Sequence, residues 1–150
     1  MRRIFPEENI IVSTNLDFYE DVCKQLPDLN PLQVLREPVM KGTAPSITLA
    51  SYHIRDINPN ANMLVVPSDL VIKDEAPYID VIERGMSFVS ENNSILTVGI
   101  KPTRPETRLG YIQIDEKQAE GIYSVRTFTE KPEESFAKVF VDSGEFYWIS

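Results

Sequence analysis

The sequence predicts an α/β fold with a mostly parallel sheet, helices on both faces of that sheet and an added antiparallel ribbon. Short apolar segments alternate with longer segments that repeat apolar residues at helical spacing, which indicates parallel strands joined by helical crossovers. Residues 63–66 are apolar throughout, as strands covered on both faces are, and residues 95–100 are expected to be a second buried strand. From residue 111 onwards the pattern alternates more, which favours antiparallel pairing.

The first part of the chain contains a strand, a helix and a second strand. Residues 10–12 are a short β-branched run, and Asn15 or Asp17 can cap a helix that reaches Lys24. Residues 32–35 follow as the next strand. This order is the beginning of the alternation that predicts the sheet.

Two longer helices follow this strand. Thr43 is expected to N-cap the first of them, and the turn residues 58–60 end it. The second helix begins at Asp74 or Pro77 and reaches about residue 91. The predicted strand at residues 63–66 lies between the two.

The ribbon closes the predicted fold. Residues 111–114 and 122–128 are its strands, a helix follows Pro132, and residues 146–148 are a last aromatic strand. Trp148 is expected to be a core residue. We expect one partial domain over residues 1–150, with no second domain.

The composition of the chain indicates which classes of partner and which compartment to expect. A net charge of −8 over 150 residues argues against nucleic acid, because phosphates favour basic surfaces. No apolar run reaches the roughly 18 residues of a membrane helix, so no membrane contact is expected. A single cysteine, Cys23, cannot form an intrachain disulfide, which favours a reducing, cytoplasmic setting. Unpaired apolar edges make a homo-oligomer an open expectation.

Several polar residues come directly after predicted strands, where ligands of such sheets bind. Glu37 can accept from both N1–H and the N2 amine of guanine, while Gly42 permits a close backbone approach. Thr43 and Ala44 begin a helix whose free N–H groups can meet base, ribose or phosphate. Taken alone, the same residues are also compatible with a capped helix after a proline turn.

Two more places have two interpretations each, and a third has one. Asp69 can hold Mg²⁺ through its carboxylate, or cap the helix that follows. Glu130 and Lys131 can bind sugar hydroxyls and phosphate, or form an ordinary exposed pair. Arg104 is expected to stabilise its loop and to pair with Glu106.

Six short motifs occur in a fixed order along the chain. They are I-I-V-S-T at 10–14, E-P-V-M-K-G-T-A-P at 37–45, P-S-D at 67–69, T-R-P-E-T at 103–107, G-Y-I at 110–112 and E-K-P at 130–132. Together they resemble the sugar-nucleotide pyrophosphorylases, and among them the mannose-1-phosphate guanylyltransferases. The resemblance covers nearly the whole chain and implies a Rossmann-like fold.

The resemblance also implies a reaction and a site. The reaction joins GTP and mannose-1-phosphate to GDP-mannose and pyrophosphate, with Mg²⁺ as cofactor. Asp69 would be catalytic and would hold the metal. The residues that would bind the nucleotide are Glu37, Pro38, Lys41, Gly42, Thr43, Ala44 and Ser68. Those that would bind the sugar phosphate are Gly110, Tyr111, Glu130 and Lys131.

Departures from the family pattern keep other interpretations open. Leu70, Arg108 and Ile149 stand where the family usually has His, Gly and Asn, which favours a non-catalytic nucleotide-sugar binding or regulatory module. A pyrophosphorylase that uses another nucleotide is the second alternative. The Gly-rich family signature G-G-x-G-x-R-L-x-P-L is absent, so we expect an internal part of a larger enzyme, incomplete at both ends and inactive alone.

Overall fold

The computed structural model describes residues 1–149 of the chain. The chain divides into two compact units, one of residues Met1–Glu91 and one that begins at Asn92. The expectation of one partial domain over residues 1–150 stays a prediction. Within the part of the chain that the structure describes, no helix is both long enough and apolar enough to span a membrane.

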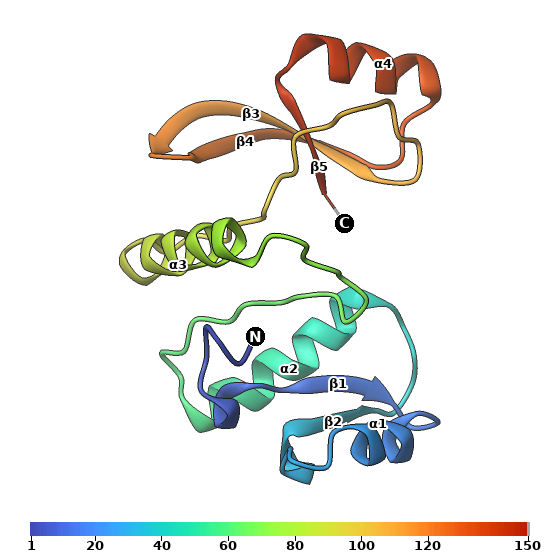
Figure 1. Cartoon of the computed structure of the whole chain (residues 1–150), viewed down its shortest axis with the longest axis vertical. Helices are drawn as coiled ribbons and strands as arrows, with labels where there is room; N and C mark the ends of the chain where they lie inside the picture. Colours follow the sequence, from blue (N-terminus) through green and yellow to red (C-terminus); the bar gives the residue numbers. More distant parts are fainter. Residues whose placement is uncertain (150) are drawn as a thin grey trace. The chain divides into compact units, whose positions relative to one another are not determined.

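A pair of parallel strands forms the sheet of the first unit (Figure 1). Strand β1 is Val12–Asn15 and strand β2 is Val34–Glu37, and the register places Asn15 opposite Glu37. Helix α1, Tyr19–Gln25, lies in the crossover, and the 3-10 turn Pro31–Gln33 leads into β2. The predicted helix and both predicted strands are confirmed with shifted ends. Because the strands are parallel, their carboxyl ends lie at one edge of the sheet.

The segments that enter the two strands are tied together by Gln33. Its Nε2 donates to the carbonyl oxygens of Glu7 and Ile10, each at 2.7 Å. Its Oε1 accepts from the backbone N–H of Asn30 at 3.1 Å. One side chain therefore fixes where β2 begins relative to β1.

Two longer helices complete the first unit. Helix α2 spans Thr43–Ile57 and helix α3 spans Glu75–Glu91, and Asn58 is the C-cap of α2, as predicted. The expected N-cap is wrong by one position: Gly42 is the N-cap, and Thr43 is the first helical residue. The physical reason is the backbone of Gly42, whose positive φ turns the chain into the helix without help from a capping side chain.

An antiparallel sheet forms the second unit, with strand order β4-β3-β5 (Figure 1). Strand β3 is Gly110–Ala119, β4 is Ile122–Thr129 and β5 is Phe146–Ile149, and helix α4 is Glu134–Ser143. Gly121 has a φ of 70° in the turn between β3 and β4. The predicted ribbon, helix and aromatic strand are confirmed.

The core of the second unit lies between this sheet and α4. Tyr111, Ala137 and Trp148 are its buried residues. The ring of Phe140 stacks on that of Phe146 with centroids 4.1 Å apart, and lies 5.4 Å from the ring of Tyr111. The prediction that Trp148 is a core residue is confirmed. These contacts fix α4 over β3 and β5.

Two predicted strands are wrong. Residues 63–66 and 95–100 form no strand, apart from an isolated antiparallel bridge between Ile100 and Trp148. The exposed fractions of Val65 and Ile95 are 48% and 99%, so their segments are not covered on both faces. A strand needs a neighbour that takes up its N–H and C=O groups, and an apolar pattern cannot provide one. Among the described residues, parallel pairing is therefore limited to β1 and β2.

Candidate functional site

The carboxylate of Glu37 stands at the carboxyl end of β2 and accepts a hydrogen bond from one hydroxyl group, which accepts in turn from a second. Its Oε1 accepts from Ser13 Oγ of β1 at 3.0 Å. Ser46 Oγ, from the first turns of α2, donates in turn to Ser13 Oγ at 3.1 Å. Strand β1 thus contacts this acidic group directly, and helix α2 is linked to it through Ser13. A carboxylate with one oxygen oriented in this way can still accept from a ligand.

The loop from Pro38 to Gly42 carries the next predicted residues. Pro38 and Lys41 are exposed, and Gly42 has φ 88° and ψ −176°. This backbone region is essentially restricted to glycine. An added Cβ at Gly42 would meet nothing within 4 Å, so the constraint comes from the backbone and not from space. The structure thus explains glycine at position 42, and its predicted role in nucleotide binding stays a prediction.

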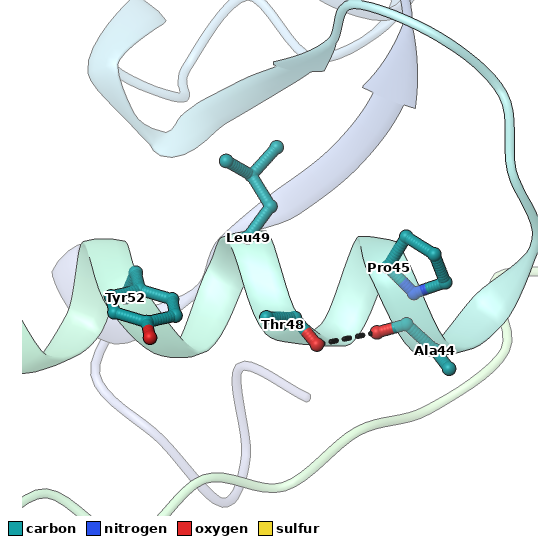
Figure 2. Close-up of a pocket in the computed structure, with 5 residues that line it drawn as sticks. All are labelled: Ala44, Pro45, Thr48, Leu49 and Tyr52. Atoms are coloured by element: carbon teal, nitrogen blue, oxygen red, sulfur yellow. Dashed lines mark hydrogen bonds between the residues drawn. The ribbon is translucent and has the colours of Figure 1, made fainter.

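The N-terminus of α2 presents Thr43 and Ala44 to solvent. Its first N–H groups have no partners within the helix and are available to an acceptor. An open, mostly apolar pocket lies along the same helix face (Figure 2). Thr48 Oγ1 donates to the Ala44 carbonyl at 2.8 Å, and Tyr52 lines the far end of the pocket. The predicted nucleotide residues Thr43 and Ala44 therefore adjoin an open, mostly apolar surface of α2.

Ser68 and Asp69 lie in an exposed turn. The N–H of Leu70 donates to the carbonyl of Pro67 at 3.5 Å and closes the turn. Within residues 1–149, no group of three or more His, Cys, Asp or Glu side chains is placed to hold a metal ion. Mg²⁺ is often bound through one or two carboxylates together with substrate phosphates. An exposed Asp69 fits the part of one such carboxylate.

In the second unit, Gly110 and Tyr111 begin β3 and are both buried. A Cβ at Gly110 would lie 3.1 Å from Ile149 Cγ1, so a larger residue would require a small shift of the Ile149 side chain. The Tyr111 hydroxyl accepts from the backbone N–H of Glu106 at 2.9 Å. The structure thus gives Tyr111 a packing role and a loop contact. Its predicted contact with the sugar stays a prediction.

Glu130 and Lys131 follow β4 and are brought together. Lys131 Nζ lies 3.2 Å from Glu130 Oε1, with side chains that are 63% and 77% exposed. Lys131 has a φ of 35°, which is uncommon for a residue other than glycine. Exposed pairs of this kind contribute little to stability. Both polar groups are therefore open to a ligand.

Glu106 contacts two arginines, of which the sequence predicted only one. The expected pair of Arg104 and Glu106 is confirmed, with Arg104 Nη2 at 3.2 Å from Glu106 Oε2. Arg108 Nε adds a second contact with Glu106 at 3.1 Å. The Arg108 side chain is the largest cause that lowers the pKa of Glu106 to about 2. The R-P-E-T-R spacing was the signal for the second arginine. Ser13 and Ser46 carried no such local signal.

The structure thus brings the predicted residues together in local groups. Glu37, the loop to Gly42 and the start of α2 adjoin one another in the first unit. Glu130 and Lys131 form a pair in the second.

Comparison with known proteins identifies relatives over most of the chain. The chain is 36% identical over 137 residues to a mannose-1-phosphate guanylyltransferase of Escherichia coli, which covers 86% of this chain and 29% of that protein. It is 36% identical over 142 residues to the xanthan biosynthesis protein XanB of Xanthomonas campestris pv. campestris (strain B100), with 93% and 30% covered. The chain therefore spans less than a third of the length of these relatives.

Solved structures resemble it as well. A crystal structure of a mannose-1-phosphate geranyltransferase from Thermus thermophilus matches with a TM-score of 0.82 at 26% identity, over 97% of this chain and 42% of that one. A crystal structure of a mannose-6-phosphate isomerase from Helicobacter pylori matches with a TM-score of 0.73 at 25% identity, over 94% and 53%. The family model described as nucleotidyl transferase matches residues 7–150. On this match, the chain belongs to the nucleotidyl transferase family.

Proposed function

We propose that this chain is part of a mannose-1-phosphate guanylyltransferase, which converts GTP and mannose-1-phosphate to GDP-mannose and pyrophosphate. The family match and the guanylyltransferase relatives support this function. The observation that carries the choice of base is the oriented carboxylate of Glu37, beside the exposed start of α2. A fixed carboxylate selects guanine because only guanine offers two adjacent donors, N1–H and the N2 amine.

The reaction would be a displacement at phosphorus. A phosphate oxygen of mannose-1-phosphate attacks the α-phosphorus of GTP, a new P–O bond forms, and the bond to the leaving pyrophosphate breaks. Such chemistry depends mainly on positioning and on neutralising charge, so no nucleophilic side chain is required. Mg²⁺, when bound at Asp69, would supply part of that neutralisation.

The roles of the remaining residues follow from their places. Pro38, Lys41 and Gly42 shape the loop after Glu37, and Thr43 and Ala44 offer the N–H groups of the α2 start. Ser68 is the neighbour of Asp69 in its turn. Gly110 and Tyr111 hold the start of β3, while Glu130 and Lys131 would receive the sugar hydroxyls and the sugar phosphate.

The proposed sugar specificity and the role of Lys131 are tested by isothermal titration calorimetry with GDP-mannose. We expect saturable binding that is weaker for UDP-glucose, and Lys131→Gln should weaken it by about tenfold, the weight of one charge-assisted hydrogen bond. Lys138→Gln is the matched control, because Lys138 is also an exposed lysine paired with a glutamate in the second unit. Equal affinity for both nucleotide sugars would refute the proposed substrate.

We further propose a cytoplasmic location and self-association. The single cysteine favours a reducing compartment. Large apolar side chains that are well exposed, such as Ile57 at 72% and Val71 at 81%, favour contact with a second copy. Sedimentation velocity over a range of concentrations tests the association, and a constant monomer would refute it.

A further inference from the structure

Two arginines share one carboxylate in the loop before β3. Glu106 accepts from Arg104 Nη2 at 3.2 Å through Oε2, and from Arg108 Nε at 3.1 Å through Oε1. Arg108 Nη2 adds a contact at 3.3 Å, and the Arg108 backbone N–H one at 3.1 Å. Glu106 is buried, with 9% of its surface exposed. The two guanidinium groups are therefore fixed close to each other around a buried anchor.

This cluster is attached to the core of the second unit at two points. The Arg104 guanidinium lies over the ring of Trp148, 5.4 Å from its centroid. The backbone N–H of Glu106 donates to the buried hydroxyl of Tyr111 at 2.9 Å. Trp148 is itself bound through backbone hydrogen bonds to Ile100, at 2.8 and 3.0 Å. The arginines therefore project from a rigid base and not from a free loop.

The cluster has more positive than negative charge. Two guanidiniums face one carboxylate, in a chain whose net charge is −8. The side chains of Arg104 and Arg108 are 63% and 84% exposed. A guanidinium has more N–H donors than these contacts use, so each retains donors toward solvent. Forked donors from two arginines match the oxygens of a phosphate group better than a single lysine does.

We propose that Arg104 and Arg108 form a binding site for a phosphate monoester. Glu106 is the positioning residue that orients both guanidiniums, and the Trp148 ring contacts the guanidinium of Arg104. The ligand chemistry is a phosphate dianion, free or carried by a sugar. The site stands on these contacts alone, so it does not depend on the proposed guanylyltransferase function.

Trp148 provides the readout because it is the only tryptophan of the chain and contacts Arg104. Its fluorescence is titrated with inorganic phosphate and with mannose-1-phosphate, at constant ionic strength adjusted with chloride. We expect a saturable change with either ligand. Tighter binding of the sugar phosphate would place the sugar beside this loop, and equal binding would show that only the phosphate is recognised; both results support the site.

Two variants test whether the arginines bind the phosphate. Arg108→Gln leaves the contact between Arg104 and Trp148 in place and should weaken phosphate binding by about tenfold. Lys138→Gln, which removes an exposed charge from α4 in the same unit, should leave it unchanged. If Arg108→Gln misfolds, NMR of the wild-type protein takes the place of this variant. The Nε–H resonances of the arginines should then shift when phosphate is added. A linear fluorescence change, equal effects of both variants, or unshifted arginine resonances would overturn the proposal.

Discussion

Ser13 Oγ donates to Glu37 Oε1 at 3.0 Å, so a side chain of β1 orients the carboxylate at the end of β2. The contact joins residues that are far apart in sequence, and the parallel register brings them together. Ser46 extends the chain of hydroxyls into α2. The proposed base-reading group is thus supported by the fold and not by its own loop.

Removing this support should weaken guanine binding without unfolding the protein. Ser13→Ala deletes one hydrogen bond to a partly exposed carboxylate, which is worth about 0.5–1.5 kcal/mol. We expect the Kd for GDP to rise by a few-fold, roughly as that energy implies, and the unfolding midpoint to change little. Isothermal titration and urea unfolding measure the two effects. Ser90→Ala on α3 is the control, and an equal loss there would mean that Ser13 has no special role.

Gly42 should tolerate a side chain less well than Gly144, although neither has an atom within 4 Å of an added Cβ. Gly144 has φ 73° and ψ 0°, a left-handed conformation that other residues sometimes adopt. Gly42 has ψ −176° at positive φ, which other residues almost never adopt. Unfolding free energies should fall for both alanine variants by about 1–3 kcal/mol, with the larger loss at Gly42. The reverse order would contradict the backbone argument.

Glu106 should make the stability of the protein depend on acidic pH. The arginine contacts lower its pKa from 4.5 to about 2 in the folded state. Its contribution is therefore complete above the unfolded-state pKa near 4.5 and is lost as the pH falls toward 2.

The test is urea unfolding at a series of pH values. Glu106→Gln should be less stable than wild type at neutral pH, and the difference should shrink as the pH falls through this window. Glu83→Gln, on α3 in the first unit, controls for the loss of one carboxylate. A difference that stays constant with pH would show that the Glu106 carboxylate is not the cause.

Tyr111→Phe should destabilise the second unit through the backbone of Glu106. The variant keeps the ring but removes the acceptor of a buried N–H, which costs about 1–3 kcal/mol. Tyr123→Phe, at an exposed position of β4, should cost much less. Unfolding free energies of the two variants measure the effect, and equal values would mean that the hydroxyl of Tyr111 contributes nothing.

Elements with strong local signals could be predicted from the sequence. Helix α3 and the ribbon of β3 and β4 have helical or alternating patterns that are complete within each segment. The apolar patterns of segments 63–66 and 95–100 are equally strong strand signals. A strand, however, depends on a partner strand that can be distant in sequence, and the local pattern does not show whether that partner exists. Local spacing therefore predicted the helices and the hairpin, whereas short apolar runs were strands at β1 and β2 and not at 63–66 or 95–100, because pairing decided the outcome.

The same distinction holds for the candidate site. The ion pair between Arg104 and Glu106 spans two residues and was predicted from its spacing. The contact between Ser13 and Glu37 depends on the register of β1 and β2, and no local pattern indicates it. The requirement for glycine at position 42 comes from φ and ψ, which only coordinates provide.

Whether Glu37 selects guanine is measured by the affinities of GDP and ADP for wild type and for Glu37→Gln. We expect that wild type binds GDP more tightly than ADP, and that Glu37→Gln weakens GDP binding by about 1.5–3 kcal/mol while ADP binding changes little. Glu83→Gln should retain the wild-type preference. Equal losses for GDP and ADP, or a wild type with no preference, would contradict the claim and leave Glu37 a structural role.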